Sequence, residues 1–170
     1  KNFFTGENMI KNNSSFFIIS TLVALFFVSC SSQEYTTAKL AVQQSDFKKA
    51  AEWLPKAMAV EPDNPEIPLV LAVEIYAQNG EWTEFIKMFN KAMSINPDKP
   101  VELRGAYTPV KEAVKNYTEY YWAAEFNSGV GQFKKIEEDP ANKLKYLETA
   151  IIHFTNASII KPADANTHAT

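Results

Sequence analysis

The sequence of 170 residues contains one cysteine, five glycines and no extended run of lysine or arginine. A single cysteine, Cys30, can form neither an internal disulfide nor a thiolate zinc site. The scarcity of glycine disfavours a fold built from β-hairpins, because their tight turns need residues with positive φ. The net charge of -3 and the lack of clustered positive charge give no basis for binding nucleic acid.

What the sequence does contain favours helices. Hydrophobic residues make up 46% of the chain, which is enough for the core of one modest domain. Alanine, glutamate, lysine and leucine, which all favour helix formation, are plentiful. We therefore expect an all-α fold.

The N-terminal part of the chain has the organisation of an export signal. Lys11 precedes an apolar run from Phe16 to Val28, and the small residue Ser29 follows that run. A positive start, an apolar core and a small residue at the cut define a secretory signal. The run is shorter than the ~20 apolar residues of a spanning helix, so we expect cleavage. Residues 1–8 precede Met9, and we interpret them as translation upstream of the true start, absent from the mature protein.

The end of this signal resembles a bacterial lipobox. The residues are Phe27-Val28-Ser29-Cys30, with phenylalanine in a place where leucine is usual. The resemblance implies a lipoprotein signal peptide at 9–29, lipid attachment at Cys30 and a polar tether at 30–34. Two or three acyl chains hold a protein on a membrane stably. The alternative is that Cys30 is an ordinary thiol beside an ordinary secretory cleavage site.

The lipobox resemblance also implies a location in the bacterial cell envelope. The protein would be lipid-anchored and would face the periplasm or the cell surface. Ser31 stands where an aspartate retains some lipoproteins at the inner membrane, so the sequence favours the outer membrane.

The rest of the chain contains an internal repeat. The segment from Lys56 to Asp63 recurs 35 residues later as the segment from Lys91 to Asp98. Equivalent positions in three copies are Ala50, Leu54, Ala57 and Pro62; Phe85, Phe89, Ala92 and Pro97; and Ala150, Phe154, Ala157 and Pro162. The first three positions of each copy share one helix face, and the small residues permit close approach of a paired helix. The proline then ends each helix.

This spacing resembles the tetratricopeptide repeat, which has a period of ~34 residues and an A-x₃-F…P pattern in its second helix. The resemblance implies antiparallel helix pairs stacked as a solenoid over residues 35–165, in three units of which the third is stretched. Residues 166–170 would begin a truncated further repeat. We expect first helices at 35–44 and 67–79, and Pro55 inside the second helix of the first unit. The family binds peptides or partner proteins on a concave surface built by its first helices.

The third unit is predicted to begin with one extended helix over about 109–135. Thr108 would cap this helix and Pro109 would stand in its first turn. Two apolar stripes follow, consisting of Val110, Val114, Tyr117 and Tyr121, and then Trp122, Phe126, Val130 and Phe133. Gly129 is placed for a close helix crossing, and residues 137–141 are expected to form an enlarged turn.

No combination of residues predicts catalysis, since a nucleophile with a base, paired acids and a ligand cluster are all lacking. His153 and His168 have no second ligand at metal-binding spacing. Three adjacent acids lack the alternation of a calcium loop, namely Glu137, Glu138 and Asp139. The Gly129-Val130-Gly131 segment lacks the Lys-Ser/Thr of a phosphate loop. We expect no enzyme activity, no cofactor and no metal.

Tyr120 lies off both apolar stripes and is the aromatic residue predicted to contact a partner, while its aromatic neighbours are expected to pack in the core. The sequence therefore predicts a non-enzymatic scaffold that binds other proteins or peptides and is attached to a membrane by lipid. The alternative is the recognition part of a larger envelope enzyme or transport protein whose C-terminal domain is missing from this fragment.

Overall fold

The computed structural model describes residues 31–162. Residues 32–162 form a compact unit with its own hydrophobic core, which is the mark of an independent folding unit. The predictions for residues 1–8, the signal peptide at 9–29, Cys30, residues 166–170 and His168 lie outside the described residues.

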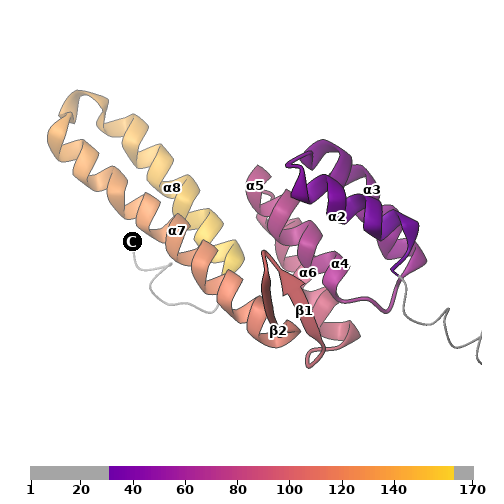
Figure 1. Ribbon diagram of the computed structural model, residues 1–170. Helices are drawn as coiled ribbons and strands as arrows, with labels where there is room; N and C mark the ends of the chain where they lie inside the picture. The colour runs from indigo at the N-terminus through magenta and orange to yellow at the C-terminus, as the bar shows by residue number, and fades with distance from the viewer. Residues whose placement is uncertain (1–30, 163–170) are drawn as a thin grey trace, which may run out of the picture. The chain divides into compact units, whose positions relative to one another are not determined.

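The described chain is built from three helix pairs, so the all-α prediction is confirmed (Figure 1). The first pair is α2 (Gln33–Gln43) and α3 (Phe47–Val60). In the second, α4 (Glu66–Leu71), the π-helix η1 (Ala72–Tyr76) and α5 (Ala77–Asn79) form one continuous segment that pairs with α6 (Trp82–Ile95). The third pair is α7 (Val110–Glu138) and α8 (Lys143–Ile160). Within residues 31–162, no helix has both the length and the apolar character needed to cross a membrane.

The repeat spacing predicted from the sequence matches the helix ends. The second helices α3, α6 and α8 each end two residues before the proline of their copy, which is Pro62, Pro97 or Pro162. The alanines at the matched positions are all buried, as expected for residues at a close helix contact. Pro55 lies inside α3 as predicted. It is on the exposed side, where water can bind the carbonyl that the proline leaves without a donor.

Leucine at Ala57 or Ala92 is expected to destabilise the fold. Both alanines are fully buried, so three added carbon atoms would overpack the helix contact and cost about 1–3 kcal/mol. Urea unfolding of each variant measures this cost. Alanine-to-leucine replacement at the exposed Ala59, also on α3, is the matched control and should leave stability unchanged. Unchanged stability in both buried variants would contradict the repeat register.

A β-hairpin that the sequence did not predict joins the second and third pairs. It consists of β1 (Pro100–Leu103) and β2 (Ala106–Pro109), paired antiparallel. Its two-residue turn is Arg104-Gly105, with φ of 50° and 80°, which matches the turn type that suits a tight hairpin. Val101 and Leu103 are buried and anchor the hairpin to the helices.

The hairpin overturns the prediction that Thr108 caps the long helix. Thr108 belongs to β2, and α7 begins at Val110 with no side-chain cap. The first N–H groups of α7 are satisfied differently, because Val110 and Lys111 donate to the carbonyls of Lys99 and Pro97. Two backbone carbonyls from the segment before the hairpin therefore replace the capping side chain.

Two further boundaries differ from the predictions. The Ser32 hydroxyl accepts a hydrogen bond from the Tyr35 N–H at 3.1 Å, so α2 starts at Gln33 and the predicted tether at 30–34 loses its last two residues. At the C-terminal end of α7, Glu137 and Glu138 extend the helix because nothing in that stretch breaks it. The enlarged turn predicted at 137–141 is instead a short 3₁₀ turn, η2 (Pro140–Asn142).

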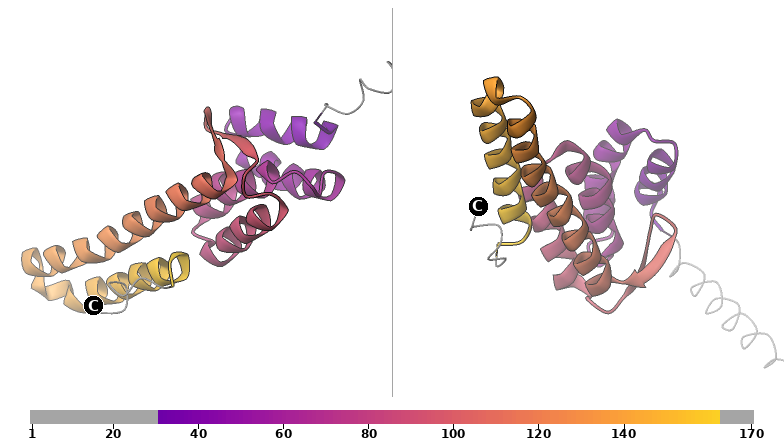
Figure 2. Two further views of the ribbon diagram at one scale, coloured as in Figure 1. Left: turned by 90° about the horizontal axis from the view of Figure 1, so that it is seen from below. Right: turned by 90° about the vertical axis from the view of Figure 1, so that its left-hand side faces the viewer.

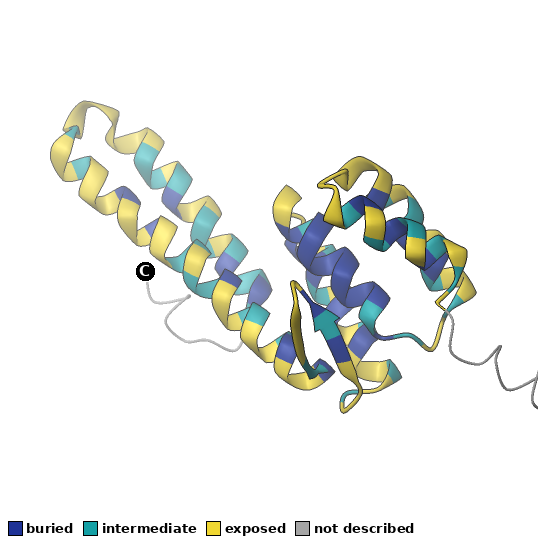
Figure 3. Cartoon of the chain, viewed as in Figure 1, coloured by how far each residue is buried: buried dark blue, intermediate teal, exposed yellow. Residues whose placement is uncertain are grey.

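The third pair is a long antiparallel hairpin of α7 and α8 (Figure 2). Gly129 confirms the predicted close crossing, because a Cβ atom there would lie 2.8 Å from the Phe154 ring. Burial declines toward the far end of the pair (Figure 3). Val130 and Phe133 of the second apolar stripe remain 45% and 40% exposed, because only α8 packs against that part of α7.

Candidate partner-binding site

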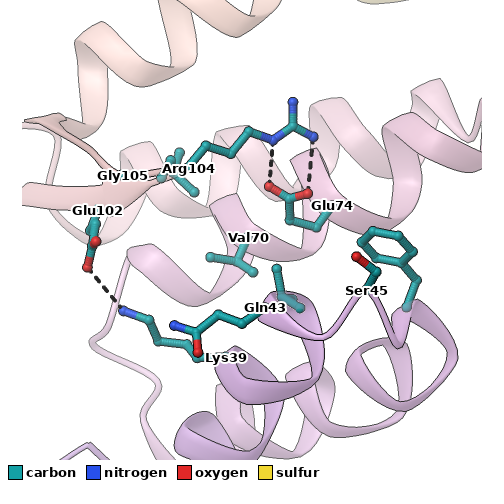
Figure 4. A pocket seen from close by; sticks show the side chains of 11 residues that line it. Lys39, Gln43, Ser45, Val70, Glu74, Glu102, Arg104 and Gly105 are labelled. Atoms are coloured by element: carbon teal, nitrogen blue, oxygen red, sulfur yellow. Dashed lines mark hydrogen bonds and ion pairs between the residues drawn. The ribbon is translucent and has the colours of Figure 1, made fainter.

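A pocket of about 380 Å³ opens on the first helices of the first two pairs (Figure 4). Its walls come from α2, the turn that follows α2, the first residue of α3, the α4–η1 segment and the tip of the β1–β2 hairpin. We call it the hairpin pocket. Its apolar lining consists of Val42, Phe47, Val70 and Leu103. Phe47 is 42% exposed, so a large ring stands at the opening.

One wall is held by an ion pair between the hairpin tip and the π-helix. Glu74 is only 7% exposed, and Arg104 donates from Nε to Oε1 at 2.8 Å and from Nη2 to Oε2 at 3.1 Å. A bidentate pair of this kind fixes direction as well as distance. The hydrogen bond and charge of Glu74 raise the pKa of Arg104 above its ordinary value, although burial opposes the shift.

The pocket residues Lys39 and Glu102 are both held by Glu66 at the start of α4. Its Oε1 accepts from the Tyr35 hydroxyl at 2.6 Å and from Lys39 Nζ at 3.0 Å, while its Oε2 accepts from the Glu102 N–H at 3.1 Å. One carboxylate thus joins α2, α4 and β1. Burial raises the pKa of Tyr35, and the hydrogen bond to Glu66 adds to that effect.

Lys39 spans the space between Glu66 and the hairpin. Its Nζ lies 3.5 Å from Glu102 Oε2, in addition to its contact with Glu66. Burial lowers the pKa of Lys39, but the hydrogen bond and charge of Glu66, with those of Glu102, outweigh burial and leave the pKa above the ordinary value. Both cations of the pocket, Lys39 and Arg104, are therefore charged at neutral pH and paired with acids.

The pocket also gathers unusual backbone conformations. In residues 31–162, the non-glycine residues with positive φ are Ser45 at 57° and Arg104 at 50°, and both line the pocket. Such conformations are uncommon for residues with a Cβ atom and persist where the surrounding structure enforces them. The π-helix that carries Glu74 is a third irregularity, and such segments are frequent at functional sites.

The first helix of the third pair lies close to the hairpin tip. Burial raises the pKa of Tyr121, and the nearby Arg104 guanidinium opposes that shift. Tyr120 is 63% exposed and meets the Tyr121 ring edge-on, with centroids 5.0 Å apart. We use the term first-helix surface for the hairpin pocket together with Tyr120. Most of these residues come from the first helices of the three pairs and from the hairpin, while Ser45 lies in the turn after α2 and Phe47 is the first residue of α3.

Residues 41–107 match the family model of the tetratricopeptide repeat. The match starts near the end of α2 and runs through α3, the α4–α5 segment, α6 and the hairpin as far as Tyr107. It therefore supports the resemblance seen in the spacing of the sequence. Tetratricopeptide repeats generally mediate protein–protein interaction and form a non-catalytic fold. No curated protein matches the chain.

The histidine and acids considered from the sequence lie outside the repeat match. His153 Nδ1 is 2.7 Å from Glu125 Oε2, which also accepts from Asn156 at 3.1 Å. This contact ties α8 to α7. Asp139 accepts from Asn142 and Tyr146 and so closes the turn between those helices. Over residues 31–162, no three histidine, cysteine or acidic side chains gather as metal ligands.

Tyr120 is exposed, as its position off both apolar stripes predicts, whereas the hairpin pocket was not predicted from the sequence. One signal was available in Glu74, the charged residue of an otherwise apolar stretch from Ile67 to Ala77. A second was the Arg104-Gly105 step after the alternating Val101 and Leu103, which is typical of a hairpin. Neither signal alone indicates that the two charges meet across 30 residues of sequence.

Proposed function

We propose that the protein is a non-enzymatic scaffold of the bacterial cell envelope that binds a partner protein on its first-helix surface and is held on the membrane by lipid at Cys30. The observation that carries the proposal is the hairpin pocket within a matched tetratricopeptide repeat region. The repeat family generally mediates protein–protein interaction, and the pocket is a defined position on this chain where a partner can bind.

The chemistry of the pocket supports binding rather than catalysis. The acids Glu74 and Glu102 face cations at 2.8 Å and 3.5 Å, so each is occupied as an ion pair. The hydroxyl of Ser45, which also lines the pocket, has no histidine partner within the described part of the chain, whereas a serine nucleophile needs an adjacent base. His153 is bound to Glu125, on a different helix pair.

The lipid anchor is supported by the lipobox resemblance, and the start of α2 indicates how close an anchored repeat would lie to the membrane. Because α2 begins at Gln33, only Ser31 and Ser32 separate Cys30 from the first helix. Two or three residues in extended conformation span about 10 Å at most. An acylated Cys30 would therefore hold the first repeat directly at the membrane surface, and the bound partner would be recruited there.

Replacing Tyr120 with alanine is expected to weaken partner binding without unfolding the protein. Its ring is mostly exposed and is free to contact a partner. Truncation of an aromatic residue that dominates an interface costs about 2 kcal/mol of binding free energy or more, which corresponds to about thirtyfold in affinity. The measurement is recovery of one identified envelope protein on the immobilised parent and variant, with helicity followed by circular dichroism. Phenylalanine at the same position is the control, since it keeps the ring. Equal recovery on the alanine variant would exclude Tyr120 from the interface.

A second candidate is the recognition part of a larger envelope enzyme or transport protein. The exposed apolar residues along the third helix pair favour it, namely Val130, Phe133, Leu144, Ile151 and Ile152. Exposed apolar side chains on a folded domain can serve as an interaction site, and another domain of the same protein is one way to cover them. Coding sequence beyond residue 170 decides between the candidates. Further helical repeats support the scaffold, and a glycine-rich, strand-forming domain supports the larger enzyme or transporter.

A further inference from the structure

We propose that the hairpin pocket takes one large apolar side chain from an extended segment of the partner protein. This inference rests on the proposed function and adds the chemistry and conformation of the bound segment. It follows from the size, the charge balance and the free polar groups of the pocket.

The size and lining of the pocket favour an apolar side chain. Its volume of about 380 Å³ falls within the ~300–1,000 Å³ of ligand-binding cavities and exceeds what a single ordered water would need. Val42, Val70 and Leu103 line the pocket together with the partly exposed Phe47 ring. Transfer of a leucine or phenylalanine side chain from water into such surroundings is favourable.

The charges of the pocket disfavour a charged occupant. The two cations, Lys39 and Arg104, balance the two acids, Glu74 and Glu102, and each is already paired (Figure 4). An entering lysine, arginine or acidic side chain would lose its water without gaining an unpaired counter-charge, which is costly. An apolar side chain has no charge to desolvate and therefore does not incur this cost.

The polar groups at the opening favour an extended main chain. Gln43 and Ser45 are exposed, and no described residue pairs with either side chain. A carboxamide offers both a donor and an acceptor, which complement a peptide C=O and N–H. A helical segment has satisfied those main-chain groups internally, whereas an extended segment leaves them free for Gln43.

The rigidity of the walls fits a preformed site. Arg104 is held by two hydrogen bonds to Glu74, and the Glu66 hydrogen bonds fix Tyr35, Lys39 and β1 to one another. The two hydrogen bonds to Glu74 also hold Arg104 in its uncommon backbone conformation, with a φ of 50°. A pocket that is rigid before binding loses less entropy when a flexible peptide enters.

Methyl NMR of residues 32–170 tests the inference with capped tripeptides Ac-Gly-Xaa-Gly-NH₂, in which Xaa is leucine, phenylalanine, glutamate or lysine. We expect the leucine and phenylalanine peptides to shift the methyl signals of Val42, Val70 and Leu103 in a saturable manner, with a Kd on the order of a millimolar. The glutamate and lysine peptides should bind at least tenfold more weakly. Equal binding of all four peptides, preferential binding of a charged one, or the absence of saturable shifts would overturn the proposal.

Two variants locate the binding. Gln43→Trp fills the opening of the pocket and should abolish the shifts, whereas Thr36→Trp, two turns earlier on the exposed side of α2, should leave them unchanged. Phe47→Ala, which removes a partly exposed ring, should weaken phenylalanine-peptide binding about tenfold and serves if the tryptophan variant does not fold. Shifts that persist in Gln43→Trp or Phe47→Ala would place the peptide elsewhere and overturn the inference.

The outcome is distinguishable from failure of the proposed function. If the envelope partner is captured equally by the parent and by Gln43→Trp, the scaffold stands and the pocket inference falls. If the apolar peptides bind at the pocket but the folded protein captures no envelope protein, the proposed function falls.

Discussion

Replacement of Cys30 by serine is expected to abolish lipid attachment, and a processed protein that lacks the lipid is expected to leave the membrane fraction. A serine hydroxyl cannot form the thioether through which bacterial lipoprotein cysteines are acylated. Each acyl chain contributes about 0.8 kcal/mol per buried CH₂, so the loss of two or three chains lowers membrane partitioning by many orders of magnitude. Within residues 31–162 there is no spanning helix to replace them.

The measurement is incorporation of an alkyne-labelled fatty acid in growing cells, followed by fractionation. Because the serine variant can retain an uncleaved signal, it is compared with a version in which an ordinary cleavable secretion signal precedes Ser31. Label on the parent and none on the variant supports the anchor. Equal membrane retention of the parent and the re-targeted version, or absence of label on the parent, contradicts it.

Replacement of Arg104 by methionine is expected to cost about 2–3 kcal/mol of folding free energy, because it leaves the buried Glu74 carboxylate without its partner. The cost is asymmetric. The Arg104 side chain is 43% exposed, so water can solvate it when Glu74 is removed, whereas Glu74 has little access to water. Methionine and arginine are both unbranched at Cβ, so the strain of the positive φ at position 104 is similar in the two proteins.

A double-mutant cycle isolates the ion pair. Glu74→Leu should cost less than Arg104→Met, and the double variant Glu74→Leu/Arg104→Met should be more stable than Arg104→Met alone, because it carries no stranded charge. Urea unfolding of the four proteins provides the free energies. If the two single effects add, or if Arg104→Met unfolds at the parental urea concentration, the ion pair does not stabilise the hairpin tip.

The sequence predicted the helix pairs because their pattern is local. Each copy has alanine on one face of its second helix and a proline just after the end of that helix. The alanines affect packing, and the proline affects the helix end, within one or two turns of their own positions. The three second helices therefore end where the prolines predicted. The long α7 was also predicted to within a few residues, since its two apolar stripes keep one helical period over most of its length.

The β1–β2 hairpin was missed for two physical reasons. Its strands are four residues each, too short for alternation to stand out, and its turn places an arginine at a position that asparagine or glycine usually fills. What stabilises that conformation is the Glu74 carboxylate, which is distant in sequence. Thr108-Pro109 was then assigned to the helix start because the same pair of residues is also common at helix N-termini.

The hairpin pocket could not be predicted because the residues that form it are distant in the sequence. Lys39, Glu74 and Arg104 come from three elements, and each alone reads as an ordinary charge on a helix or a loop. Their meeting depends on the packing of β1 against α4 and on the π-helix that directs Glu74 toward the hairpin. Tyr120 was accessible to prediction because its exposure follows from the helical period of a single element.

Site-specific photocrosslinking in living cells is the most direct test of partner binding on the first-helix surface. Benzoylphenylalanine is placed at Gln43 or Tyr120 on the first helices and, as matched exposed controls, at Glu52 or Lys87 on the second helices. We predict discrete adducts with the same partner protein from Gln43 and Tyr120 and none from the control positions. Adducts that form only from Glu52 and Lys87, or equally from all four positions, would contradict partner binding on the first-helix surface.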